Sequence, residues 1–345
     1  SMTTSGSAAA LGFVEETDCA TFPELSVDAS GEVSVTEFAD GDVFGFVDTH
    51  SHLFTNLAFG GGGSFHGAPF HPLGVEHALP NCELNHGEAG RKDFIGFSFG
   101  GGLTDFDLLL PLFTQGALSD DQHVTDGYPD FTEWPSAPFS STHQMQYYKW
   151  IERAYLSGLR LMVQHVTTNQ VLCQLAIGIG AQTQRLSCND MITADRMIDE
   201  AYALERYIDA QSGGPGEGWL RIVFSPQEAR EQISAGNLAV VLGIETSDLF
   251  DCYLVPFQGF SKCTKDDVVA KLDNHRQDSV VAVVLSRANR TTMSGVRDNA
   301  ARASFNPFPG ASLFVLSRST VRAKDDILRL QRIDQCVLNS FEGGF

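Results

Sequence analysis

Short apolar runs alternate with longer amphipathic segments through the middle of the chain. Uninterrupted apolar runs predict strands that are buried on both faces, and apolar residues spaced three and four apart predict helices. The predicted strands lie at residues 43–47, 159–166, 220–224, 238–244, 280–285 and 312–316. Helices are predicted from a capping box at Ser141 and Gln144 to Gly158, over 191–210, from a capping box at Ser225 and Glu228 to Gly236, and over 325–341.

Strands and helices alternate with short connections, a pattern typical of parallel β/α units. An open doubly wound sheet fits this pattern. Polar residues stand where strands end, however, and chemistry in barrels gathers at the carboxyl ends of the strands. The fold class predicted is therefore α/β, with a (β/α) TIM-like barrel. Only six strands are predicted where a closed barrel has eight, so either strands are hidden elsewhere or the barrel is incomplete at its C-terminus.

The domain organisation predicted is a loose N-terminal arm over 1–41, followed by a single barrel-like domain over 42–345. Within this domain, residues 54–140 form an irregular insertion after the first strand, rich in glycine and histidine. Long excursions of this kind in compact domains are usually functional. Residues 276–345 are an atypical C-terminal segment, because the strongly acidic balance of the chain becomes basic after His275.

The net charge of −20 argues against binding to nucleic acid, whose phosphates would repel the protein. The chain contains no apolar run of 18 residues, so no membrane span is predicted. Seven cysteines lack any CxxC pair, which argues against a zinc knuckle. Cys173 with Cys188, or Cys252 with Cys263, could close short loops in an exported protein; the alternative is buried thiols. A secreted or periplasmic location is favoured slightly over a cytoplasmic one.

The strongest chemical motif is Asp48-Thr49-His50-Ser51-His52, after the first apolar run. Residues two apart in a strand point to the same side, so His50 and His52 present neighbouring imidazoles. This pair predicts a metal site for zinc, iron, nickel or copper, and Asp48 is predicted to orient a ligand from behind. A pair of hydrogen-bonded structural histidines is the alternative.

Further candidates stand at other strand ends and in the insertion. Glu245 closes the apolar strand 238–244 and is predicted to meet the histidine pair as a metal ligand; the alternative is a capping or solvent-facing acid. His165 ends the strand 159–166 and is a candidate for the pocket. Within the insertion, His66, His71, His77 and His86 are predicted to line the pocket, supply a ligand or lie on the surface, and His143 is expected in the first turn of a helix.

Three segments, together with the glycine- and histidine-rich loop after the first of them, resemble a bacterial branch of the renal (membrane) dipeptidase-like proteins, in the metal-dependent amidohydrolase superfamily. They are residues 48–52, 144–155 and 238–245, and the resemblance covers roughly residues 44–263. It implies a (β/α) barrel with one or two zinc ions that hydrolyses peptide-like or other amide bonds. It also implies that His50, His52 and Glu245 are metal ligands and that Glu245 belongs to the catalytic set.

This chain departs from the dipeptidases in two respects. It has His-x-His on the first strand where they have His-x-Asp, and only His275 follows Glu245, although the family takes further histidines from later strands. The alternative function is thus a catalytically incomplete barrel that binds a metal or ligand. The partner expected is a small-molecule or peptide substrate, and a second copy of the chain could supply the missing strands in a homo-oligomer.

Overall fold

The computed structural model describes residues 29–99, 111–130 and 142–252 with short interior gaps, parts of 262–271, and the strands at 280–285, 301–302 and 312–315. Most of the predicted arm over 1–41, and all of the helix predicted over 325–341, lie outside the described residues. The segment that carries the predicted metal ligands is described almost throughout.

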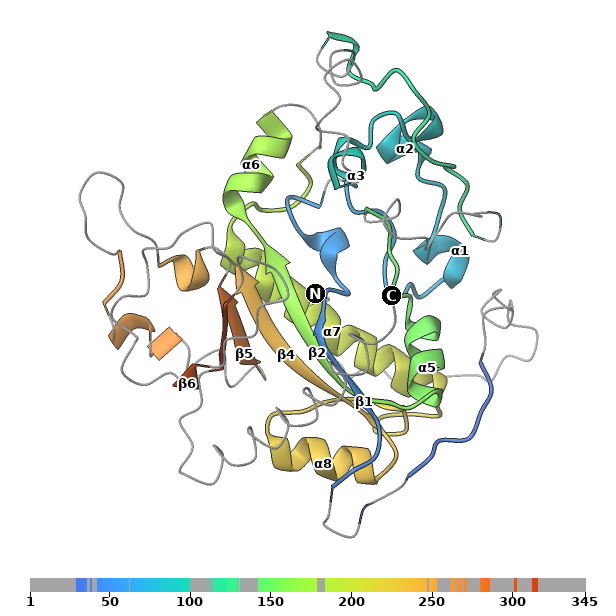
Figure 1. Cartoon of the computed structure of the whole chain (residues 1–345), viewed down its shortest axis with the longest axis vertical. Coiled ribbons are helices and arrows are strands. Elements are labelled where there is room, and N and C mark those ends of the chain that lie inside the picture. The colour runs from blue at the N-terminus through green and yellow to red at the C-terminus, as the bar shows by residue number, and fades with distance from the viewer. Residues whose placement is uncertain are drawn as a thin grey trace, which may run out of the picture.

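The described strands form one sheet with the order β1-β2-β4-β5-β7-β6, and β3 also pairs with β4 (Figure 1). The strands are β1 (Phe46–Ser51), β2 (Leu159–Thr168), β3 (Leu220–Ile222), β4 (Leu238–Thr246), β5 (Val280–Leu285), β6 (Ala301–Arg302) and β7 (Ser312–Val315). The pairings β1–β2, β2–β4 and β4–β5 are parallel. The protein is therefore an α/β protein whose sheet contains the four neighbouring parallel strands β1, β2, β4 and β5, as the alternation of elements predicted. β7, however, pairs with β5 in the antiparallel sense, so the parallel pattern ends there.

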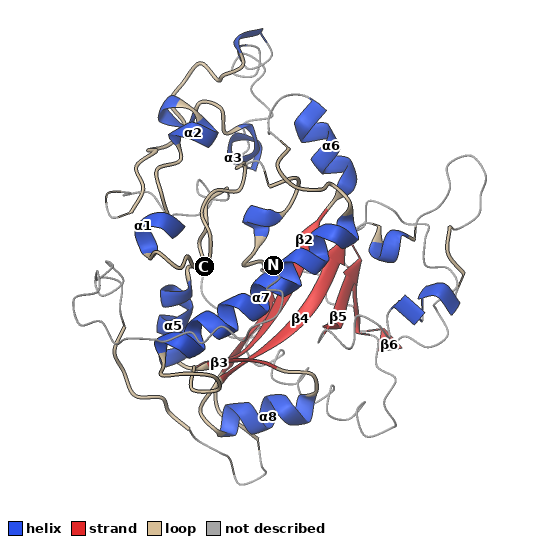
Figure 2. Ribbon diagram, turned by 180° about the vertical axis from the view of Figure 1, so that it is seen from behind, coloured by secondary structure: helices blue, strands red, loops and turns tan. Residues whose placement is uncertain are grey.

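The apolar runs of β2 and β4 are buried along nearly their whole length, because helices cover both faces of the sheet. On one face, Met197, Leu204 and Ile208 of α7 (Asp190–Gln211) join the core that contains Met162 and Leu242. Figure 2 shows α7 lying across β2 and β4. On the other face, α8 (Pro226–Ser234) packs Ala229 and Ile233 in a smaller cluster with Leu161 and Ala239. This arrangement confirms the prediction of strands covered on both sides.

The capping box predicted at α8 is present. The Ser225 side chain accepts a hydrogen bond from the backbone N–H of Glu228, at 3.2 Å, and Pro226 is the first helical residue. The Glu228 carboxylate in turn accepts from the backbone N–H of Phe224, at 2.8 Å. In the usual capping box this carboxylate accepts from the N–H of the capping residue itself, which here is Ser225. This local sequence is sufficient to start the helix where it does.

Two predictions near the first strand are wrong. β1 spans Phe46–Ser51 rather than 43–47, and Phe46 is exposed, so the strand is only partly covered. The helix predicted from Ser141 begins only at Tyr148, as α5 (Tyr148–Leu156). The Gln144 amide instead donates to the carbonyl oxygen of Leu53, at 2.7 Å, and its oxygen accepts from the N–H of Gln146. The segment is therefore held extended against the turn after β1.

The insertion contains more regular structure than predicted, although each helix that the structure describes there is short. It holds η2 (Thr55–Leu57), α1 (Val75–Ala78), α2 (Glu83–His86), η3 (Glu88–Gly90) and α3 (Phe94–Phe99). The expectation that His143 lies in a helix is wrong: it forms a parallel bridge with His66. α6 (Gln170–Gly178), which directly follows β2, and the short η5 (Leu249–Asp251) were also not predicted. Figures 1 and 2 place α1, α2 and α3 toward the same end of the molecule as α6.

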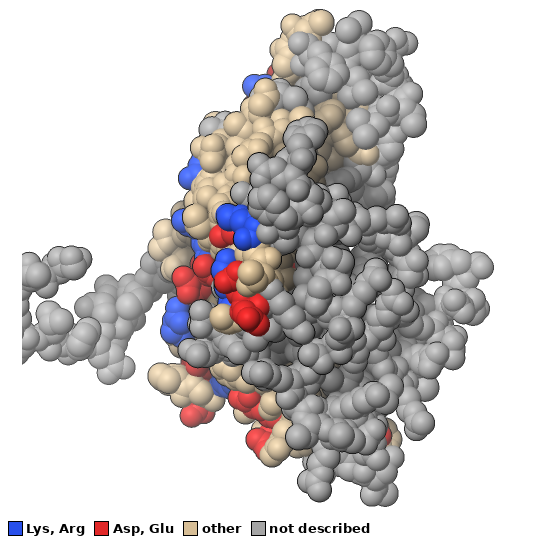
Figure 3. All heavy atoms as spheres, turned by 90° about the vertical axis from the view of Figure 1, so that its left-hand side faces the viewer, with Lys and Arg blue, Asp and Glu red and all other residues tan. Residues whose placement is uncertain are grey.

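The described surface carries charges of both signs. On the face in Figure 3, Lys and Arg side chains are interspersed with Asp and Glu side chains. Among the described helices, none combines the length and the apolar character that crossing a bilayer requires.

Candidate metal centre

The predicted ligands come from two strands that are not neighbours in the sheet. His50 lies near the carboxyl end of β1, His52 follows that strand directly, and Glu245 is the penultimate residue of β4. β2 runs between these strands and pairs with both in parallel. Because all three strands end at the same edge, their last side chains gather there. The sheet order therefore explains how residues nearly 200 positions apart in the sequence come together.

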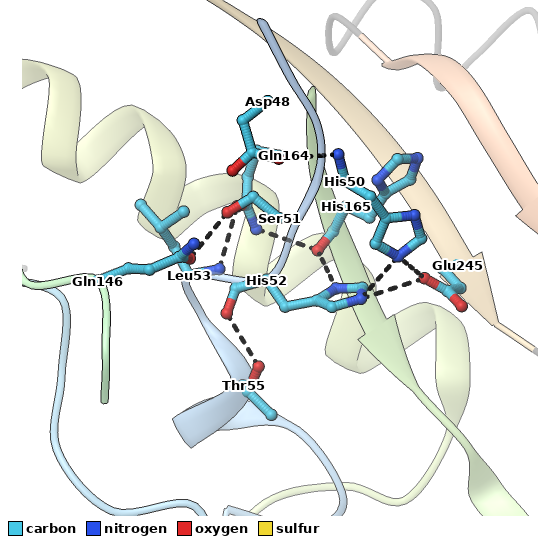
Figure 4. A network of polar contacts seen from close by, with 10 residues as sticks. All are labelled: Asp48, His50, Ser51, His52, Leu53, Thr55, Gln146, Gln164, His165 and Glu245. Atoms are coloured by element: carbon cyan, nitrogen blue, oxygen red, sulfur yellow. Dashed lines mark hydrogen bonds and ion pairs between the residues drawn. The ribbon is translucent and has the colours of Figure 1, made fainter. Parts of the chain in front are cut away.

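The three side chains converge on one point (Figure 4). Nε2 of His50 lies 2.9 Å from Oε2 of Glu245, and Nε2 of His52 lies 3.3 Å from the same oxygen. The two Nε2 atoms are 2.9 Å apart. One atom of each residue thus belongs to a group that could hold a single metal ion. The geometry expected from the His-x-His spacing and the strand-end glutamate is present.

The hydrogen bond on the far side of His52 determines which of its nitrogens faces the site. Nδ1 of His52 lies 3.0 Å from the carbonyl oxygen of His165. A carbonyl only accepts, so Nδ1 carries the proton and Nε2 of the neutral ring presents a lone pair. Oε2 of Glu245 is buried, and within the described chain its polar neighbours are the two imidazole nitrogens. A lone pair and a carboxylate oxygen directed at one point form a ligand set suited to a cation.

The electrostatics of the site are dominated by the carboxylate beside two imidazoles. Burial would raise the pKa of Glu245, but the His50 and His52 imidazoles beside its carboxylate outweigh this effect and hold the pKa far below its usual range. The hydrogen bond to Glu245 likewise raises the pKa of His50, against the effect of burial. Glu245 is therefore an anion at any ordinary pH, as a metal ligand must be.

A network of amide side chains fixes the turn that carries His52 (Figure 4). Oε1 of Gln164 accepts from the N–H of Leu53 at 3.0 Å, and its Nε2 donates to the carbonyl of His165 at 3.0 Å. The Ser51 hydroxyl donates to Gln146 at 2.7 Å. Gln164 therefore ties the residue after His52 to the same carbonyl that orients the His52 ring.

The other predicted residues have different positions. His165 lies beside the site: its ring stacks on His50 with centroids 4.5 Å apart, and burial lowers its pKa to about 3. The Asp48 carboxylate accepts from the backbone N–H of His50, at 3.1 Å, and so braces the strand rather than a ligand ring. Burial raises the pKa of Asp48.

The insertion histidines do not join His50 and His52. His71 stacks on His77, with ring centroids 5.3 Å apart. His66 has both ring nitrogens engaged, by the carbonyl of Pro80 and the amide of Asn85. His86 instead belongs to a second group of potential metal ligands, with Cys82, His123 and His143.

Sequence reasoning missed this second group. No CxxC pair marks the group, although Cys82 and His86 are four residues apart, a spacing that places both on one side of a helical turn. The sequence pattern predicts His143 in a helix and gives no signal for His123. No local pattern joins these two residues to Cys82, because only the fold of the insertion does so.

Comparisons of the chain with protein-family models, with curated proteins and with solved structures each found no match.

Proposed function

We propose that the protein is a metal-dependent hydrolase of peptide-like or other amide bonds, with a small-molecule or peptide substrate. The observation that carries this proposal is the convergence of His50, His52 and Glu245 at the carboxyl ends of parallel strands. A parallel α/β sheet with candidate ligands at this edge is compatible with a (β/α) barrel. We propose that the sheet belongs to such a barrel.

The residues present fit one or two zinc ions. His50 and His52 would hold the ion through Nε2, and Glu245 would hold or bridge it through its carboxylate. Bound zinc supplies hydroxide at neutral pH and polarises a carbonyl. The chain itself contributes the orientation of the ligands: the carbonyl of His165 holds the His52 tautomer, and Gln164 holds the adjoining backbone. The neutral His165 ring packs against His50 and limits its rotation.

The two disulfide bonds support a secreted or periplasmic location for this hydrolase. They join Cys173 to Cys188 and Cys252 to Cys263, the two pairings considered from the sequence. Disulfides form and persist mainly in oxidising compartments.

The experiment measures bound zinc and the hydrolysis of a panel of dipeptides by the wild-type protein and by His50→Ala and Glu245→Gln. We expect turnover in the wild type, and a fall of about 100-fold or more in both variants, because each loses a metal ligand. His77→Ala is the matched control, since it removes an imidazole from the His71–His77 pair. Its zinc content and activity should equal those of the wild type.

The alternative function, a metal- or ligand-binding protein without turnover, is favoured by one observation. Two imidazoles and one carboxylate form the group found here in the described residues, fewer ligands than the dipeptidases use. Zinc bound through His50 without hydrolysis of any dipeptide would support this alternative. Hydrolysis that is unchanged in His50→Ala, or wild-type protein that binds no zinc at this site, would contradict the proposed hydrolase.

A further inference from the structure

A second set of metal-ligating side chains lies inside the insertion. Cys82 precedes α2, and His86 is the last residue of that helix, so one helical turn separates them. His123 and His143 come from segments far along the chain. Both Cys82 and His86 are buried, at 2% and 1% exposure. Four potential ligands from three segments thus meet in the interior of the insertion.

The four ligand atoms are arranged compactly. One atom of each residue lies within 4.8 Å of the ligand atoms of the other three. Tetrahedral zinc with imidazole and thiolate ligands separates its ligand atoms by roughly 3.3–3.6 Å, so small side-chain shifts would close the group. The cluster is therefore compact enough for small side-chain movements to form a four-coordinate site.

The three imidazole rings are nearly perpendicular to one another. His86 and His143 lie 4.8 Å apart, between ring centroids, with an interplanar angle of 89°. His123 and His143 lie 4.7 Å apart at 89°, and His86 and His123 lie 5.3 Å apart at 83°. The rings therefore meet edge to face rather than stacked, and one nitrogen of each lies within 4.8 Å of a nitrogen of the other two.

Backbone carbonyls determine the tautomers of two of the rings. Nε2 of His86 donates to the carbonyl of Ser64 at 3.3 Å, and Nδ1 of His123 donates to the carbonyl of Val124 at 3.0 Å. The opposite nitrogens, Nδ1 of His86 and Nε2 of His123, are buried and face the interior of the cluster, where the Asp93 carboxylate lies near both. Metal-bound histidines characteristically donate their other N–H to a carbonyl or carboxylate in this way.

A buried carboxylate supplies negative charge next to the cluster. Oδ2 of Asp93 lies 3.4 Å from Nε2 of His123 and 3.7 Å from Nδ1 of His86. The Thr142 hydroxyl and the N–H of Gly96 hold this carboxylate in place. A Cys82 thiolate and the Asp93 carboxylate would together balance the charge of a divalent cation, so the site could bind one at little electrostatic cost.

Two glycines of the insertion make room for these side chains. A Cβ on Gly90 would lie 2.5–2.6 Å from ring atoms of His123, and a Cβ on Gly96 would lie 2.3 Å from Oδ2 of Asp93. Backbone therefore packs directly against both groups. This close approach gives one physical reason for the abundance of glycine in the insertion.

We propose that Cys82, His86, His123 and His143 bind one zinc ion in a closed structural site, separate from the His50–His52–Glu245 group. Four protein ligands and no open position are characteristic of structural rather than catalytic zinc. The site would fasten α2 to the segments at 123 and 143, and so hold the insertion together in place of a long regular element. The inference does not depend on hydrolase activity.

The test uses the full chain with Cys19→Ser and Cys336→Ser, so that Cys82 is its one cysteine outside the two disulfides. Zinc is replaced by cobalt, because a thiolate bound to cobalt gives a near-ultraviolet charge-transfer band that imidazole and carboxylate ligands do not give. We expect the band in this protein and after a further His50→Ala change, since that variant removes only the sulfur-free site. It should disappear in Cys82→Ser, with the loss of one zinc equivalent.

X-ray absorption at the zinc edge of the His50→Ala protein measures the zinc ligands directly and requires no substitution in the proposed site. We expect one sulfur at about 2.3 Å and nitrogen ligands at about 2.0–2.1 Å. A shell of nitrogen and oxygen only, a cobalt band that persists in Cys82→Ser, or no metal retained by the His50→Ala protein would overturn the proposal. In each case the cluster would be a hydrogen-bonded group of buried side chains. Dipeptide hydrolysis can fail while this result stands, so the two proposals are tested separately.

Discussion

At the scale of single residues, both candidate sites depend on groups that are not ligands themselves. The carbonyl of His165 selects the tautomer of His52, and the carbonyls of Ser64 and Val124 select those of His86 and His123. Each of these carbonyls is a backbone group that any residue type would supply. The sequence therefore does not reveal these contacts. Conventional ligand motifs therefore show only part of either site.

Gly90→Ala tests the packing of the second site. The new methyl group would collide with the His123 ring, so we expect loss of the cobalt–thiolate band and a lower midpoint of thermal unfolding. Gly116→Ala is a matched control, because Gly116 has nearly the same φ, +74° against +73°, but has no neighbour within 4 Å of the added carbon. Both variants carry the same backbone strain. Equal zinc content in the two would show that His123 is not held by Gly90.

At the scale of elements, the first site lies at the carboxyl ends of strands, and a side chain near the end of α7 stabilises the connection to the sheet. The carboxylate of Asp209, near the end of α7, accepts from the N–H groups of Gly216 and Gly218 and from Arg221 of β3. This one side chain organises the connection from α7 into β3. Burial would raise the pKa of Asp209, but these three donors outweigh it and leave the pKa below its ordinary value.

Asp209→Asn should lower the free energy of unfolding by about 1–2 kcal/mol at pH 7, because the neutral amide keeps only one acceptor oxygen for donors that now bind both carboxylate oxygens. The folded-state pKa lies below that of the unfolded chain, so the stabilisation is complete above the unfolded pKa and is lost as pH falls through the folded pKa. The difference between wild type and variant should therefore shrink below about pH 4. Urea unfolding at several pH values measures it. Glu217→Gln, an exposed acid in the same connection, serves as control; an equal effect there would contradict the assignment.

At the scale of the whole molecule, covalent links and candidate metal sites supplement the core around the sheet. The disulfide Cys173–Cys188 ties α6 to the segment before α7, and Cys252–Cys263 closes the chain after η5. They span 15 and 11 residues. Closing loops of these lengths restricts the unfolded chain and stabilises the fold by about 3 kcal/mol each.

Reduction with a phosphine should therefore lower the midpoint of thermal unfolding, and mass spectrometry after alkylation should find four additional modified cysteines. A variant with serine at 173, 188, 252 and 263 is the control, because its lower midpoint should not respond to the reductant. Full alkylation of the unreduced, unfolded wild type would contradict both disulfides.

The sequence predicted most of the elements whose pattern is local. The apolar runs of β2 and β4, the amphipathic stripe of α7 and the Ser225 cap each carry their own physical cause within a few residues. The helix expected from Ser141 failed because a distant partner, the backbone of Leu53, competes for the Gln144 side chain. Local pattern contained nothing about that competitor.

The kinds of chemistry available can be read directly from the sequence: a His-x-His pair on the first strand, a carboxylate after an apolar strand, and histidines within a glycine-rich insertion. Which of these groups meet depends on the folded arrangement. Sheet order brings Glu245 to His50 and His52 across β2, and the folding of the insertion brings His86, His123 and His143 to Cys82. The physical reason is the sequence separation of the residues that interact. Strands and helices depend on residues close in sequence, whereas a metal site requires side chains distant in sequence to meet at one point in space.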